Sequence, residues 1–131
     1  MNDLDDISLN KKGFAYRDLI EQDRWEAFSP TFTSLTVVGA TTYTGRVRVV
    51  GRQCFFQVTL LAATSIASTA GTTYMTLPIT ATGIAGSAAM TNETTDVAVG
   101  VCHIDPGNSR CYLPSQGASG NTFTVAGWYE V

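Results

Sequence analysis

One group of residues in the sequence has the types and spacing that nucleophilic catalysis or metal binding requires. It contains the single histidine, His103, with Cys102 before it and Asp105 two positions after it. Cys102 and His103 are adjacent on a predicted strand, so their side chains point to opposite faces. Asp105 shares a face with His103, but it opens the run Asp-Pro-Gly-Asn, which is typical of a turn. We therefore interpret this group as a turn and not as a catalytic or metal site.

Glu93 and Asp96 form a second candidate, a pair of carboxylates close in sequence. Paired carboxylates held about 5–9.5 Å apart hydrolyse glycosides, and carboxylate and carbonyl oxygens also bind calcium. The pair lies in a polar stretch between two predicted strands and lacks the dense acidic pattern of a calcium loop. The sequence favours a solvated loop here, and it predicts no enzyme activity, no cofactor and no metal.

Arginines and aromatic residues provide candidates for binding. Arg46, Arg48 and Arg52 form the densest basic group, and the first two share one face of a predicted strand. Such a face suits an anionic partner, such as an acidic capsid surface or a bacterial polysaccharide, or it is simply a soluble outer face protected from edge pairing. Trp128 and Tyr129 could stack on a sugar or pack in the core and at a subunit interface. Arg46, Arg48, Trp128 and Tyr129 are thus our candidates for a subunit interface or ligand platform.

The elements that position these residues are predicted to be strands. From Thr31 onward the chain is rich in threonine, valine, glycine and aromatic residues, with turn residues about every ten positions, which is typical of an antiparallel sandwich or barrel. Gly51 and Arg52 fit a tight hairpin turn. The run from Gln53 to Leu61 is more continuously apolar than the strand before it, which predicts a strand buried on both sides. The predicted strands are 31–38, 43–50, 53–61, 72–77, 87–91, 96–103, 111–113, 122–126 and 128–131.

The first 28 residues differ in character from the rest. The stretch Tyr16 to Phe28 contains good helix formers and predicts one short helix, ended by Ser29 and Pro30. We interpret residues 1–28 as an attachment arm and residues 29–131 as the sandwich domain. The arm residues expected to make contacts are Tyr16, Leu19, Ile20, Trp25 and Phe28.

Charge is concentrated in this arm. Of the 19 charged side chains (8 basic and 11 acidic), 11 lie in residues 1–26, and the remainder of the chain has no lysine and no net charge. A formal net charge of −3 gives no general affinity for nucleic acid. No apolar run is long enough for a membrane span, and the acidic N-terminus lacks a signal peptide, which predicts synthesis in the cytoplasm. Free thiols are therefore expected for the three cysteines, with a Cys102–Cys111 link as the alternative.

Several short motifs, taken in order, resemble a small domain that recurs in virion proteins of tailed bacteriophages, at tail-fibre tips and in head fibres or capsid decoration proteins. The motifs are Trp25, 30–33, 43–52, 55–60, 76–79, 112–114 and 127–131. The resemblance implies an antiparallel, jelly-roll-like β-sandwich that is commonly trimeric and has no catalytic machinery.

Tail fibres generally carry this domain on a long shaft with a tail-binding head, and neither is visible in this sequence. The resemblance therefore favours a capsid decoration protein, a knob or head fibre on the virion surface. Its expected partners are copies of itself and the major capsid protein or another virion protein, with no nucleic acid and no membrane. The alternative is a receptor- or carbohydrate-binding tip domain of a tail fibre, whose partner would be a host-surface glycan.

Overall fold

The computed structural model describes residues 24–83 and 85–131, and the predictions for Tyr16, Leu19 and Ile20 lie outside this part of the chain. The described residues form antiparallel strands and one short 3₁₀ turn, so the predicted all-β sandwich is confirmed. The strands are β2 (Glu26–Phe28), β3 (Phe32–Thr33), β4 (Thr36–Val38), β5 (Thr42–Val50), β6 (Gln53–Leu61), β7 (Ser65–Ser68), β8 (Tyr74–Thr76), β9 (Gly86–Asn92), β10 (Val97–Asp105), β11 (Arg110–Tyr112), β12 (Gln116–Ser119) and β13 (Thr122–Glu130), and the turn η1 is Pro106–Asn108.

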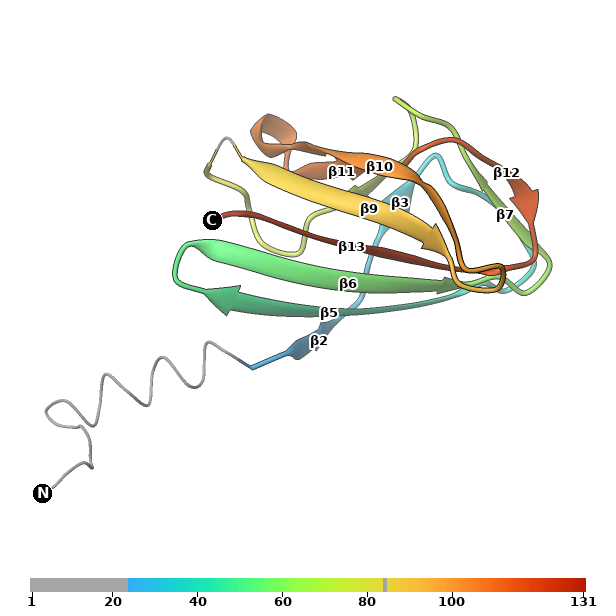
Figure 1. Cartoon of the computed structure of the whole chain (residues 1–131), viewed down its shortest axis with the longest axis horizontal. Coiled ribbons are helices and arrows are strands. Elements are labelled where there is room, and N and C mark those ends of the chain that lie inside the picture. The colour runs from blue at the N-terminus through green and yellow to red at the C-terminus, as the bar shows by residue number, and fades with distance from the viewer. Residues whose placement is uncertain (1–23, 84) are drawn as a thin grey trace, which may run out of the picture.

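One long sheet curls over to form both layers of the sandwich. Its strand order is β2-β5-β6-β13-β9-β10-β11-β8-β3. The first half of β10, from Val97 to Cys102, pairs with β9, and its second half, from His103 to Asp105, pairs with β11. The sheet therefore turns its corner along β10. A smaller sheet, β12-β7-β4, lies toward one end of the long strands (right in Figure 1).

The hairpin of β5 and β6 forms as predicted. Val50 pairs with Gln53 across a two-residue turn, and Gly51 adopts a φ of 61°, which glycine tolerates without strain. The prediction that the second strand is buried on both sides is wrong for this chain. Cys54, Phe56 and their alternate neighbours are fully buried, whereas the opposite face of β6 is only half-buried. This mostly apolar segment therefore forms a strand with one fully buried face and one more exposed face.

The core lies between the two layers and is closed by large side chains from both. The largest fully buried side chains are Tyr129, Phe56, Phe123, Leu60, Ile66, Met75, Met90 and Leu113. The three cysteines are also buried and are free thiols, so the alternative Cys102–Cys111 link is not formed. Burial of these side chains removes apolar surface from water, which is the main favourable contribution to folding.

The predicted helix does not extend to Phe28, because Glu26–Phe28 is strand β2. Glu26 pairs with Val47 and Phe28 with Gly45 at the edge of the long sheet. Gly45 makes room for this strand, since a Cβ there would lie 2.7 Å from the ring of Phe28. Packing of Phe28 against the core outweighs a helix propensity that is marginal in so short a segment. The sheet therefore begins before the boundary expected at residue 28.

Candidate functional site

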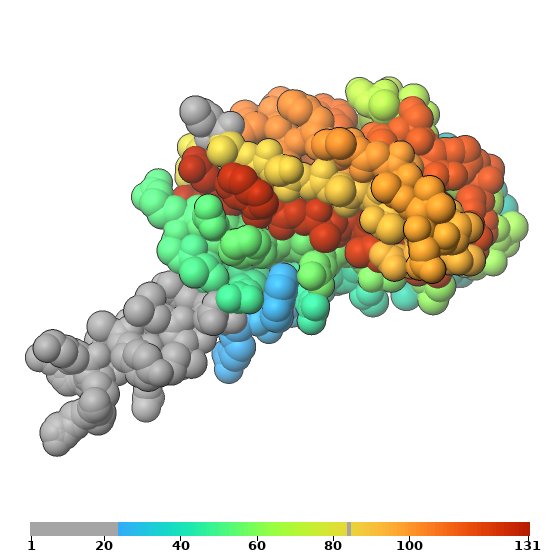
Figure 2. Space-filling view, viewed as in Figure 1, coloured from blue at the N-terminus to red at the C-terminus, as the bar shows by residue number. Residues whose placement is uncertain are grey.

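The solvent side of β5, β6, β13 and β9, which we call the outer face, holds most of the predicted binding residues. These long strands lie side by side in Figure 1 and form a continuous surface in the space-filling view of Figure 2. Because strands alternate their side chains, every second residue faces outward. The register aligns three rows across the strands: Thr44-Thr59-Thr124-Thr91, Arg46-Gln57-Ala126-Ala89 and Arg48-Phe55-Trp128-Ser87.

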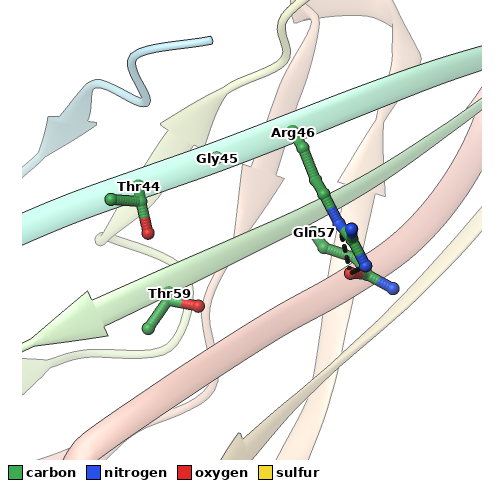
Figure 3. Close-up of a pocket in the computed structure, with 5 residues that line it drawn as sticks. All are labelled: Thr44, Gly45, Arg46, Gln57 and Thr59. Atoms are coloured by element: carbon green, nitrogen blue, oxygen red, sulfur yellow. Dashed lines mark hydrogen bonds between the residues drawn. The ribbon is translucent and has the colours of Figure 1, made fainter. Parts of the chain in front are cut away.

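Arg46 and Gln57 form a fixed bridge between β5 and β6. The Nε and Nη2 atoms of Arg46 donate hydrogen bonds to Oε1 of Gln57, at 2.9 and 2.6 Å. Figure 3 shows the arginine side chain reaching from one strand to the next to make this contact. The guanidinium also lies over the indole of Trp25, with 4.5 Å from Cζ to the ring centroid. These contacts hold a positive charge in a defined orientation at the surface.

Arg48 lies one row further along and also contacts Trp25, with its Cζ 5.9 Å from the ring centroid. Phe55 and Trp128 are direct cross-strand partners on the same row. Both are half-buried, so part of each ring faces solvent. The arginines and the aromatic rings therefore form one mixed cationic and aromatic surface.

Two hollows on the outer face meet at Gln57. The first measures about 300 Å³ and is lined by Thr44, Gly45, Arg46, Gln57 and Thr59. The second measures about 200 Å³, and its lining includes Trp25, Arg48, Phe55 and Gln57, with Ala126 and Gly127. We call the two hollows together the outer furrow. Its described lining includes two arginines and no carboxylate, so its charge is positive.

The structure separates residues that the sequence grouped together. Arg46, Arg48 and Trp128 share the outer face, whereas Tyr129 points into the core and is fully buried. Trp25 lies on the outer face, but Phe28, from the same end of the chain, packs on the inner side of the sheet. The predicted platform is thus brought together without Tyr129 and with the addition of Trp25.

Phe55, Gln57, Thr44 and Thr59 belong to the furrow and were not predicted. Phe55, Gln57 and Thr59 alternate along β6, and this period of two was the available signal. It was hidden because Phe55 extends the apolar run of the buried residues around it. The cross-strand partners Arg46 and Gln57 could not be paired before the register was known.

The group around His103 has the geometry of a turn. Cys102 is buried while His103 is exposed, so the two side chains diverge as predicted. The side-chain amide of Asn108 donates a hydrogen bond to Oδ2 of Asp105 at 2.9 Å and lowers the pKa of that carboxyl. A hydrogen bond with Cys102 raises the pKa of the Cys111 thiol, and burial raises it further. A thiol with a raised pKa is a poor nucleophile at neutral pH.

Glu93 and Asp96 lie on an exposed turn between β9 and β10. Asn92 organises this turn, because its Oδ1 accepts hydrogen bonds from the backbone N–H groups of Thr94 and Thr95. The loop predicted from the sequence is therefore present. In the described ranges, no three His, Cys, Asp or Glu side chains gather where they could hold a metal ion.

Within residues 24–83 and 85–131, no helix is long and apolar enough to cross a membrane. Comparison of the chain with protein-family models, with curated proteins and with solved structures finds no match.

Proposed function

We propose that this chain is a structural protein of a bacteriophage particle, a capsid decoration protein that attaches to the shell through its N-terminal arm. The resemblance of its motifs to phage virion domains motivates the proposal. The observation that carries it is the junction between the charged N-terminal residues and the sandwich. Most of the charge of the chain lies in residues 1–26, and β2 joins that segment to the edge of the long sheet.

The residues at the junction contact both sides of the long sheet. Phe28 is wedged against the inner side at Gly45, while Trp25 packs on Arg46 and Arg48 at the outer face. Strand β2 adds backbone pairing to β5 between these two contacts. Residues 25–28 are thus held to the sheet on both of its sides.

In this proposal the protein is a homotrimer at the virion surface. Three arms on one trimer would act together, because linked contacts gain in effective concentration and hence in avidity. Val97 and Val101 of β10, which are 59% and 78% exposed, are the apolar side chains that we expect the subunit contacts to cover.

The decisive experiment removes residues 1–23 and leaves β2 and Trp25 in place. Phage particles lacking this protein are incubated with the full chain or with the truncated chain, and bound protein is measured after sedimentation. We expect the truncated chain to fold, as judged by circular dichroism, and to lose at least about 100-fold in apparent affinity as three arm contacts are lost. Equal decoration by both chains would overturn the proposal, and labelled protein found on the tail would assign it to a fibre tip instead.

A further inference from the structure

We propose that the outer furrow binds an acidic polysaccharide, with Arg46 receiving a sugar carboxylate. This is a second binding activity, beyond attachment through the arm, and it uses a different part of the molecule. The furrow combines a fixed cation, polar groups and aromatic rings along a few adjacent strands. That combination is the one required to bind a sugar chain with negative charge.

The charge argument begins with the hydrogen bonds of Arg46. A guanidinium has five N–H groups in a planar fork, and two of those of Arg46 are donated to a single neutral acceptor, Oε1 of Gln57. Three N–H groups remain, and they include both on Nη1. The terminal Nη1–Nη2 edge can therefore still receive a carboxylate with two parallel hydrogen bonds.

Arg110 is an arginine of the same chain whose surroundings include an acidic side chain. Its Nη1 donates a hydrogen bond to the hydroxyl of Tyr112 at 3.1 Å, its Cζ lies 4.2 Å from the ring centroid of Tyr74, and Asp105 contributes a favourable charge. Around Arg46 the described lining of the furrow supplies aromatic and amide groups but no acid. A carboxylate from a ligand would complete the site electrostatically.

Polar groups beside Arg46 suit sugar hydroxyls. Thr44 and Thr59 are cross-strand partners, and their hydroxyls lie in the hollow next to the Arg46–Gln57 bridge (Figure 3). The amide nitrogen of Gln57 adds donors, since only its oxygen is used by Arg46. Hydroxyl and amide groups can each donate or accept, as a polyhydroxylated ligand requires.

Aromatic rings occupy the other end of the furrow. Trp25 and Phe55 line the second hollow, and Trp128 lies directly across from Phe55. Such rings offer flat apolar faces, which suit the apolar face of a pyranose. The two hollows, about 300 and 200 Å³, lie at or below the lower limit of about 300 Å³ for small-molecule pockets, so successive small units of a chain fit better than one large ligand.

A nucleic acid is the less suitable anionic polymer. Binding to a phosphate backbone depends on neutralising many phosphates at once, and the furrow provides two arginines on a chain with a formal net charge of −3. One carboxylate for each few sugar units matches this sparse charge. The observations therefore favour a carboxylated polysaccharide.

The test measures binding of hexagalacturonate to the full chain by isothermal titration calorimetry, with maltohexaose as the neutral probe. Loss of one charged hydrogen-bonded contact costs roughly 10-fold or more in affinity, so we expect R46Q to weaken hexagalacturonate binding by about that factor. R52Q is the matched control, because it removes the same charge from the hairpin turn outside the furrow. We expect R52Q to bind within about 2-fold of the unmodified chain, as a remote surface charge contributes little.

Q57E provides a second variant that keeps the shape of the furrow. It places a carboxylate against Arg46 from within the chain, so it should abolish hexagalacturonate binding even if R46Q folds poorly. Four results would overturn the proposal. The first two are no binding of hexagalacturonate by the unmodified chain at millimolar sugar, and an affinity for maltohexaose equal to that for hexagalacturonate. The others are equal losses of affinity in R46Q and R52Q, and self-association of the chain through Arg46 in place of sugar binding. A chain that begins at Arg24 keeps the furrow, so attachment and sugar binding can fail independently.

Discussion

Tyr129 and Trp128 are neighbours in sequence with opposite environments. Trp128 lies on the outer face, while Tyr129 is fully buried and its hydroxyl bonds to the backbone of Ile79. It donates to the carbonyl of Ile79 at 2.7 Å and accepts from the N–H of the same residue at 3.0 Å. Burial, more than any other cause, raises the pKa of this hydroxyl, so it remains a donor at all ordinary pH values.

Replacing Tyr129 with phenylalanine should therefore destabilise the fold without changing its shape. Both backbone groups of Ile79 would lose their partner, and each of these part-buried hydrogen bonds contributes about 0.5–1.5 kcal/mol. Urea unfolding followed by tryptophan fluorescence measures this loss. Y43F is the control, since Tyr43 is half-buried and its hydroxyl makes no hydrogen bond within the described part of the chain, so the loss should be less than about 0.5 kcal/mol. Equal losses in the two variants would contradict the assigned role of Tyr129.

Residue types predicted part of the candidate site but not its composition. The alternation around Arg46 and Arg48 placed both arginines on one face, and the structure confirms this placement. Gln57 and Trp25 were not linked to them, because Gln57 is a cross-strand neighbour and Trp25 directly precedes an added edge strand. Alternation fixes the face of a side chain, whereas its neighbours depend on long-range pairing that no local pattern contains.

Strand β2 forms where the local sequence predicts a helix, and it adds an edge strand to the long sheet. Deleting residues 1–28 removes it, whereas deleting residues 1–23 does not. Burial of a phenylalanine contributes about 1.5–3 kcal/mol, so the longer deletion should lower the free energy of unfolding by roughly 1–3 kcal/mol, because Phe28 is only partly buried. The shorter deletion serves as the control and should leave the urea midpoint unchanged. Similar midpoints for both would mean that β2 adds nothing to the sheet.

The predicted strands succeed where β-branched and aromatic residues dominate. The bounds of Gln53–Leu61 agree with β6, and the Val-rich segment before it agrees with β5 to within one residue. Strands β7 and β12 were missed, because serine, alanine and glycine give little β signal and tertiary pairing must hold them. Gly127 divided the last strand into two predictions, yet β13 is continuous. A Cβ at this glycine would collide with Ser87 and Ala88 on β9.

At the scale of the whole molecule, exposed valines make self-association testable. Val101 is 78% exposed, more than the other large apolar side chains in the described part of the chain. If β10 lies in the proposed trimer interface, V101K should raise the dissociation constant at least about 10-fold, because burial of an unpaired charge is costly. Sedimentation equilibrium measures the change. V38K, on the 50% exposed Val38 of β4, is the control, and a monomeric unmodified chain would exclude the trimer.

The position of β13 affects how the protein can be made. It follows all the other described strands in the chain, yet it lies between β6 and β9 and pairs with both along nearly its whole length (Figure 1). A nascent chain on the ribosome therefore holds two half-sheets that cannot close until residues 122–130 emerge. Closure of the sheet must wait for residues 122–130 and depends on non-local contacts, which makes folding slow. A product that terminates before Thr122 would lack the strand that joins the halves, and it would be recognised by proteases as unfolded.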